Sequence, residues 1–158
     1  MRFILSSHEN IAKFSVLFQN IRSFTEHVVL YVSANGIHMQ GMDSSHCTCF
    51  EIKLHSSWFD VFEFDSDNDI SSIGLSTNVL QKIIGTKRDT QTIEIEVSEG
   101  NDNLMASFTG GEKVLDKFFE IPLMDIDQEL FNIVSSNSVV DVIMPCKYFS
   151  VLISQLHI

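Results

Sequence analysis

A strand-like run, an amphipathic segment and three more strand-like runs follow one another in this chain, and the same order then returns. This repetition constrains the fold more than any other feature of the sequence. The first pass covers residues 2–54 and the second covers residues 70–123. Self-similarity over such a period indicates a duplicated structural unit. The sequence therefore predicts an α+β fold of two βαβββ units, with the helices on one face of antiparallel sheets.

The first unit is predicted around a helix at residues 10–25, where apolar side chains recur at three- and four-residue steps. The polar side of this helix carries Lys13 and Arg22 and no acidic residue between residues 10 and 25. Strands are predicted at residues 2–6, 28–33, 37–41 and 47–54. A tight turn at residues 33–36 is indicated by Asn35 and Gly36, because both residue types tolerate a positive φ.

The second unit repeats this order after an acidic loop at residues 65–69. A helix is predicted at residues 77–84, where Ser76 and its neighbours are capping residues and Gly85 is a typical stop. The apolar residues of this helix that are predicted to face the core are Val79, Leu80, Ile83 and Ile84. Strands of the second unit are predicted at residues 70–75, 90–97, 103–109 and 118–123. Residues 58–64, between the units, suit a covering segment or a short strand.

The last part of the chain predicts a third unit that is only begun. Residues 124–137 are too long and too poor in Gly and Pro for a tight turn, which indicates an ordered connector. A strand at residues 139–144 and a helix at residues 146–157 follow. A lone strand and helix cannot bury their apolar faces. We therefore expect a complete domain at residues 1–123 and the opening of a truncated second domain at residues 138–158, or one that another chain completes.

The composition limits the classes of protein to which the chain can belong. Its formal net charge is −11, so a nucleic-acid surface must be local. Three cysteines without framework spacing indicate reduced thiols in an intracellular compartment. We see no leader and no apolar run of the roughly 20 residues that a membrane span needs, so we expect a soluble protein.

Several motifs resemble chemical sites without meeting their requirements. Asp43, Ser44 and His46 are hydrolase residue types, but such close neighbours cannot adopt a triad geometry. The acidic loop at residues 65–69 begins like a calcium loop, yet Ile70 stands where Gly is needed and Ser76 where Glu is needed. No catalytic residue is therefore predicted.

The pair Cys47 and Cys49 lies near three histidines, at positions 38, 46 and 55. If residues 47–54 form a strand, both thiols share one face of it beside apolar residues. We expect buried thiols there rather than a metal site.

Four short segments resemble one known family. Residues 36–40 read Gly-Ile-His-Met-Gln and residues 42–46 read Met-Asp-Ser-Ser-His. Residues 112–114 read Glu-Lys-Val, and residues 123–127 read Leu-Met-Asp-Ile-Asp. In this order and spacing, they resemble the N-terminal half of the proliferating cell nuclear antigen family, the eukaryotic-type DNA sliding clamps. The likeness is specific at residues 42–46, because packing alone would not dictate residue choice in a polar corner.

The resemblance implies a closed ring whose helices line a central hole around duplex DNA. It implies neither an enzyme nor a protein that carries a cofactor. Such clamps act as polymerase processivity factors in the nucleus, or at a viral replication site. Phosphate contacts would come from Lys13, Arg22, Lys82, Lys87, Arg88 and Lys147. Without the resemblance, basic residues on exposed helix faces are usually solubility features. The third helix departs from the family, because Val151 and Ser154 stand where basic residues are usual.

The resemblance also implies a groove for partner peptides that carry a Gln and an apolar-aromatic plug. Its residues here would be Met42, His46, Cys47, Cys49, Ile126, Leu130 and Ile133. The ordinary alternative is that Met42 is a core residue and that Leu130, Phe131 and Ile133 only hold the connector in place. The family completes this groove with later segments, so we expect poor peptide affinity from this chain alone.

The implied partners are duplex DNA, DNA polymerase, the clamp loader and other proteins with clamp-binding peptides. The family resemblance favours a homotrimer for the full-length form. The net charge of −11 keeps one alternative open, a clamp-like interaction module that binds partners without encircling DNA.

Overall fold

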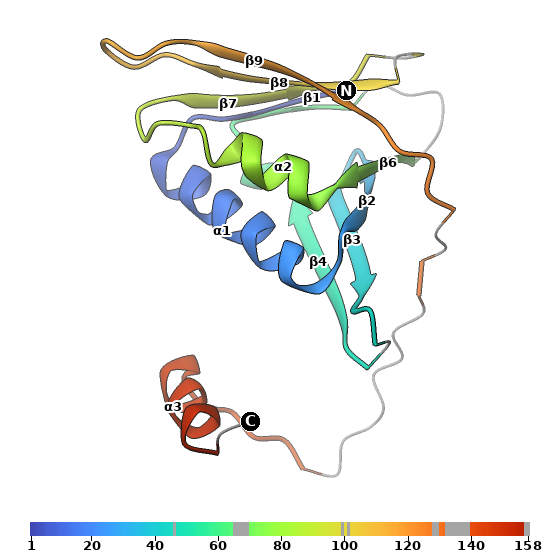
Figure 1. Ribbon diagram of the computed structural model, residues 1–158, viewed down its shortest axis with the longest axis vertical. Coiled ribbons are helices and arrows are strands. Elements are labelled where there is room, and N and C mark those ends of the chain that lie inside the picture. The colour runs from blue at the N-terminus through green and yellow to red at the C-terminus, as the bar shows by residue number, and fades with distance from the viewer. Residues whose placement is uncertain are drawn as a thin grey trace.

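The computed structural model describes residues 1–45, 47–64, 70–98, 100, 102–127, 130–131 and 140–156. Its elements follow the predicted order (Figure 1). The helices are α1 (His8–Phe24), α2 (Thr77–Ile84) and α3 (Cys146–Leu156), with a short 3-10 helix, η1 (Ser56–Trp58). The strands are β1 (Arg2–Leu5), β2 (His27–Ser33), β3 (Gly36–Met42), β4 (Cys49–His55), β5 (Val61–Glu63), β6 (Ser71–Ser76), β7 (Thr92–Glu96), β8 (Asn103–Thr109) and β9 (Lys117–Pro122).

The duplication is confirmed, and the two units exchange their first strands. One antiparallel sheet has the order β5-β1-β7-β8-β9 and the other has the order β4-β3-β2-β6. Strand β1 of the first unit therefore pairs with β7 of the second, and β6 of the second pairs with β2 of the first. The short strand β5 is an addition to the pattern. Because each sheet needs a strand from the other unit, the two units form one domain.

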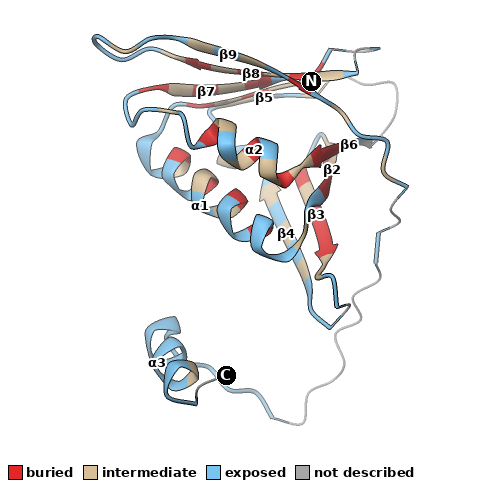
Figure 2. Cartoon of the chain, viewed as in Figure 1, coloured by how far each residue is buried: buried red, intermediate tan, exposed pale blue. Residues whose placement is uncertain are grey.

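Helices α1 and α2 lie side by side and pack against each other (Figure 1). In α1 the buried residues are Ile11, Phe14, Phe18 and Ile21, at the predicted three- and four-residue steps, whereas Phe24, the last of the predicted series, is 41% exposed. In α2 the buried residues are Thr77, Leu80 and Ile84, and Val79, predicted in the buried stripe, is 41% exposed. Figure 2 shows buried residues on the helix sides that face the sheets and along the strands. Each large apolar side chain buried in this way stabilises the fold by roughly 1.5–3 kcal/mol.

Both helix starts differ from the predicted capping. Helix α1 begins at His8, two residues earlier than predicted, and thus includes Glu9. Ser7 and Ser76 occupy the N-cap positions, but neither side chain makes a capping hydrogen bond. Thr77 is fully buried instead, and its Oγ1 donates to the carbonyl of Thr25 at 2.7 Å. This bond fixes the start of α2 to the end of α1.

The turn between β2 and β3 has the predicted chemistry. Ser33 pairs with Gly36, so the loop consists of Ala34 and Asn35. Gly36 has a φ of 137°, and a Cβ there would overlap the carbonyl oxygen of Leu54 on β4. Only glycine fits this close approach of two strands.

The end of the chain differs from the prediction in one respect. Residues 140–144, the described part of the predicted strand, are not in a strand, and Val140 and Ile143 are 75% and 97% exposed. A strand needs a neighbour for its backbone groups, and no strand among the described residues pairs with this segment. Helix α3 forms as predicted, apart from the two sheets in Figure 1, and none of its described residues is buried. No helix in the described part is long and apolar enough to cross a membrane.

We expect Phe18→Ala to lower the free energy of unfolding by about 3–5 kcal/mol, because it leaves a cavity at the centre of the core. Phe18 is 1% exposed, whereas Val16 on the same helix is 53% exposed. Val16→Ala is the matched control and should change stability by less than about 0.5 kcal/mol. Urea denaturation measures both, and equal losses would contradict this description of the core.

Candidate nucleic-acid interface and partner groove

Arg22 joins the exposed sides of α1 and α2. Its Nε donates to Asn78 Oδ1 at 2.6 Å, and its Nη1 donates to Gln81 Oε1 at 3.0 Å. Lys82 lies one turn after Asn78 on α2, is exposed, and makes no ion pair with a described residue. The structure thus brings Arg22 and Lys82 onto adjacent helices, on the surface that faces away from both sheets.

Lys13 has an acidic partner on its own helix. Its Nζ lies 2.6 Å from Glu9 Oε1, one turn earlier, and this hydrogen bond lowers the pKa of Glu9. The expectation of an acid-free polar side is therefore wrong, because α1 begins before residue 10. An exposed pair of this kind is weak, because solvent and salt screen the attraction. Lys13 can exchange Glu9 for another anion at little cost.

Lys87 and Arg88 differ in their accessibility. The Lys87 side chain is only 12% exposed, and its Nζ lies 3.6 Å from Asp89 Oδ1. Arg88 is exposed and makes no ion pair with a described residue. Lys147 is exposed on α3, which the structure does not bring beside α1 and α2 (Figure 1).

Two further basic residues lie beside Arg88 and were missed in the sequence. Lys113 and Lys117 line a cavity of about 440 Å³ together with Arg88 and Asp89. Lys113 has a φ of 59°, in the left-handed region that non-glycine residues seldom adopt, and its side chain is exposed. The Nζ of Lys117 donates to the carbonyl of Thr86. Three cations and one carboxylate therefore line the same cavity, in a chain that is strongly acidic overall, and this carboxylate lies beside Lys87.

The buried side chain of Gln91 holds this basic cluster together. Gln91 is 1% exposed, and its Nε2 donates to the carbonyls of Phe108 and Leu115 at 3.0 and 2.9 Å. Its Oε1 accepts from the backbone N–H of Arg88 at 3.0 Å. One amide thus joins the loop after α2 to the loop after β8. No local sequence pattern could have predicted this pairing, because Gln91 stands 24 residues from Leu115.

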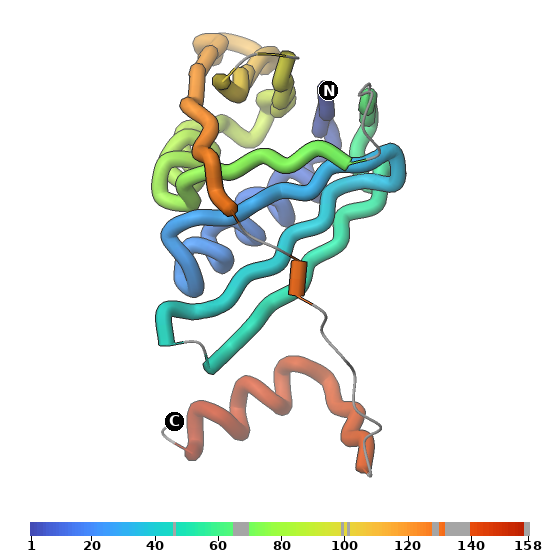
Figure 3. Tube along the Cα trace, turned by 90° about the vertical axis from the view of Figure 1, so that its right-hand side faces the viewer, coloured from blue at the N-terminus to red at the C-terminus, as the bar shows by residue number. Residues whose placement is uncertain are grey.

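The connector crosses the outer face of the sheet β4-β3-β2-β6. At its start, the backbone N–H of Met124 donates to the carbonyl of Gly74 on β6 at 2.9 Å. A Cβ at Gly74 would overlap the Met124 carbonyl oxygen, so the close approach requires glycine. Further along, the backbone of Phe131 bonds to the side chain of Gln40 on β3. Figure 3, which looks onto this sheet, shows the described parts of the connector in front of its strands.

The row of residues beneath the connector is set by strand register. Gly74 pairs with Val29, Val29 pairs with Gln40, and Gln40 pairs with Glu51, so the four lie across one face of the sheet. Val29 is 2% exposed, although its neighbours Val28 and Leu30 are the ones that face the core. The connector above this row explains the burial of Val29.

The polar corner after β3 is built around the carboxylate of Asp43. Its Oδ1 accepts from the backbone N–H groups of Cys47 and Thr48 at 2.9 and 2.7 Å, and its Oδ2 accepts from Ser45. These bonds, with that of the Ser45 hydroxyl the largest and the Thr48 N–H next, lower the pKa of Asp43 to about 2. The carboxylate therefore shapes the turn, and its lone pairs are used in doing so.

The predicted groove residues lie around this corner and the connector. Met42 ends β3 and pairs with Cys49, the first residue of β4. The expectation of buried thiols is wrong, because Cys47 precedes the strand and the inward positions of β4 are Phe50, Ile52 and Leu54. Ile126 is half-buried and Leu130 is 43% exposed. His46 and Ile133 lie outside the described residues.

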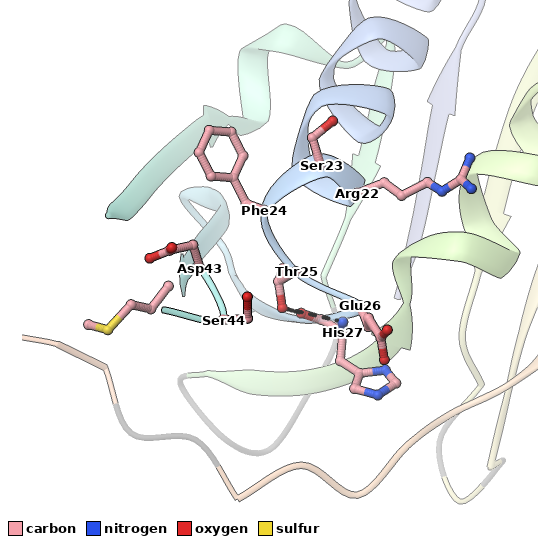
Figure 4. Close-up of a pocket in the computed structure, with 9 residues that line it drawn as sticks. Arg22, Ser23, Phe24, Thr25, Glu26, His27, Asp43 and Ser44 are labelled. Carbon is pink, nitrogen blue, oxygen red and sulfur yellow. Dashed lines mark hydrogen bonds between the residues drawn. The ribbon is translucent and has the colours of Figure 1, made fainter. Parts of the chain in front are cut away.

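A second cavity, of about 450 Å³, adjoins the same corner (Figure 4). It lies between the end of α1 and residues 42–44, and Arg22 and Phe24 line it. The ring centroids of Phe24 and Phe50 are 5.9 Å apart. Met42, Asp43 and Ser44 line this cavity, and Met42 is also one of the predicted groove residues. In the described part of the chain, no group of three or more His, Cys, Asp or Glu side chains could hold a metal ion.

Comparison with known proteins identifies similar molecules. A family model described as proliferating cell nuclear antigen (PCNA), N-terminal domain, matches residues 7–130. A crystal structure of PCNA from Thermococcus kodakaraensis is 21% identical over 85% of this chain and 51% of that one, with a TM-score of 0.75. The PCNA2–PCNA3 complex from Sulfolobus tokodaii is 18% identical over 87% and 52% of the two chains, with a TM-score of 0.72. The chain thus spans about half the length of these archaeal structures.

We expect Ser45→Ala to raise the pKa of Asp43 from about 2 toward its ordinary 3.8, because the Ser45 hydroxyl is the largest cause of the depression. A depressed pKa means that the carboxylate stabilises the corner fully above pH 3.8 and that this stabilisation is lost as the pH falls through about 2. A carbon-detected NMR titration of the Asp43 carboxyl measures the shift. An Asp43 pKa that Ser45→Ala leaves unchanged would contradict this structure of the corner.

Proposed function

Because the chain belongs to the PCNA family, whose clamps are not enzymes, we propose that it forms part of a DNA sliding clamp that encircles duplex DNA and acts as a polymerase processivity factor. The observation that carries this proposal is the joint surface of α1 and α2, where Arg22 spans the two helices and Lys82 lies exposed beside it. Sliding along DNA requires contacts to phosphates without readout of bases. Separated cations on the exposed sides of α1 and α2 can supply such contacts.

The proposed DNA contacts fall into two groups. Arg22, Lys82 and Arg88 are exposed and free of acidic partners among the described residues, and Lys113 and Lys117 extend this set beside Arg88. Lys13, Lys87 and Lys147 contribute less. Lys13 and Lys87 lie beside Glu9 and Asp89, and Lys147 stands on the separate helix α3. The second group would contact phosphates only by leaving an acidic partner or after further assembly.

The proposed partner groove lies between the connector and the corner after β3. A short peptide with a Gln and an apolar-aromatic plug would contact Met42, Cys47, Cys49, Ile126 and Leu130, with His46 and Ile133 as further candidates. Met42 suits a groove that accepts several partners, because Met repacks easily. The partners would be DNA polymerase, the clamp loader and other replication and repair proteins.

The proposal extends to assembly, domain division and location. Strand β9 is at one edge of its sheet, and Phe118 on it is 65% exposed, which favours pairing with another chain. We propose a multimeric ring, with three copies in the full-length form. Residues 1–123 would be its first domain, residues 124–137 the connector and residues 138–158 the opening of a second domain. The nucleus, or a viral replication site, is the proposed location.

The acidic partners of Lys13 and Lys87 favour a second candidate, a clamp-like module that binds partners without encircling DNA. The two candidates predict different run lengths for a DNA polymerase. Under the first, the natural, complete protein forms rings and raises the number of nucleotides that a polymerase adds per binding event. A complete protein that forms no rings and leaves run length unchanged would exclude the first.

We expect the double substitution Lys82→Gln, Arg88→Gln to weaken the binding of the natural protein to duplex DNA. If each residue contacts one phosphate, the slope of log K against log salt should shrink by about 1.8. Lys53→Gln, on the outer sheet, is the matched control and should leave the slope unchanged. Binding measured over a salt series tests this, and an unaltered slope in the double variant would favour the module without DNA contact.

A further inference from the structure

We propose that Gln40 and Glu51 are positioning residues for the connector. The side-chain amide of Gln40 binds the backbone of Phe131 as a neighbouring strand would, and Glu51 holds that amide in place. The effect of this contact on peptide binding rests on the partner groove proposed above. The placement of the connector by Gln40 does not depend on that groove.

The geometry at Gln40 is that of a peptide group. Its Oε1 accepts from the N–H of Phe131 at 2.8 Å, and its Nε2 donates to the carbonyl of the same residue at 3.2 Å. A residue in an antiparallel ladder exchanges the same two bonds with its partner. Gln40 is 3% exposed, so these bonds also satisfy polar atoms that are shielded from water.

The position of Gln40 in the sheet explains why a side chain is used. Strand β3 lies between β2 and β4, so its backbone groups are taken by the ladders on both sides. At the edge strand β6 the connector forms a hydrogen bond directly with the backbone of Gly74. Above the central strand β3 the connector can be bound only by a side chain, because the backbone groups of β3 are already paired. A Gln at the outward-facing position of β3 supplies the missing donor and acceptor.

Glu51 lies directly across from Gln40 and selects its orientation. Glu51 Oε1 accepts from Gln40 Nε2 at 3.1 Å. A carboxylate can only accept, so it keeps the NH₂ group on its own side and leaves Oε1 for the N–H of Phe131. His38 Nε2 and Lys53 Nζ, at 2.9 and 3.1 Å, hold the same carboxylate oxygen. The amide is thus oriented even before the connector binds it.

Neither described side chain of the connector at this point is fully buried. Leu130 and Phe131 are 43% and 37% exposed. The two hydrogen bonds of Gln40 therefore set the height and register of the connector here. Gln40 and Met42 lie on the same face of β3, two residues apart, so this placement also sets the distance between the connector and the corner.

Amide hydrogen exchange, followed by NMR on the full chain, tests the anchor. We expect Gln40→Met, which keeps the length of the side chain but cannot form these hydrogen bonds, to lower the protection factor of the Phe131 N–H about tenfold or more. The N–H of Met124, bonded to Gly74, is the internal reference and should keep its protection. Loss at Phe131 alone supports the anchor. Unchanged protection at Phe131, relative to Met124, overturns it.

Variants of Glu51 separate orientation from a general structural role. Glu51→Met should lower the protection of Phe131, whereas Glu51→Gln should preserve it, because a carboxamide oxygen can still accept from Gln40. The N–H of Met124 is again the internal reference and should keep its protection in both variants. Equal protection of Phe131 in Glu51→Met and in the unsubstituted chain would overturn the role of Glu51.

A peptide titration on the natural protein tests the consequence for the groove. The probe is a labelled synthetic peptide with a Gln and an apolar-aromatic plug, and Gln40→Met should weaken its binding. Unchanged affinity, together with lost protection at Phe131, overturns the positioning role in the groove. If the unsubstituted protein binds no such peptide, the proposed groove is wrong, and hydrogen exchange still decides whether Gln40 and Glu51 position the connector.

Discussion

The exchange of one strand between the two βαβββ units is the constraint on which the rest of the structure depends. Strand β1 completes the sheet of the second unit and β6 completes the sheet of the first. The buried stripes of α1 and α2 then close against the two sheets as one core. Neither sheet can form without the other unit. The exposed surface of the helix pair and the outer face of β4-β3-β2-β6 are therefore held as opposite sides of one rigid body.

Each side of this body is suited to a different kind of contact. The helix side offers separated cations, of which Arg22 and Lys82 are exposed and make no ion pair with a described residue, and the chain as a whole is acidic. The sheet side offers a connector fixed at Gly74 and Gln40, with the corner of Asp43 beside it. In the proposed clamp, this separation would leave the DNA-facing surface free while partners bind on the other side. In the proposed arrangement of the connector, Glu51 orders Gln40, and Gln40 binds the backbone of Phe131.

Local patterns predicted the elements well, and long-range pairings lay beyond them. The stripe of α1 and the turn at Gly36 follow from spacing and backbone preference, so both could be read from the sequence. The anchoring of Phe131 by Gln40 could not, because 91 residues separate the two and neither stands in a motif for it. The pairing of Lys13 with Glu9 was missed for a smaller reason, since a two-residue error in the start of α1 left the acid outside the helix. Alternation in β4 places Cys49 on the face of Glu51 and Lys53, opposite the inward Phe50, Ile52 and Leu54, so the expectation of a buried thiol there misread the pattern.

The central claim is topological, namely that the natural protein encircles duplex DNA rather than adhering to its surface. Retention on a closed circular duplex, compared with the same duplex after a single double-strand cut, tests it most directly. A ring that slides has no route off the circle and leaves the linear form through its ends. We therefore predict stable retention on the circle and rapid loss after the cut. Equal retention on both forms would contradict the claim.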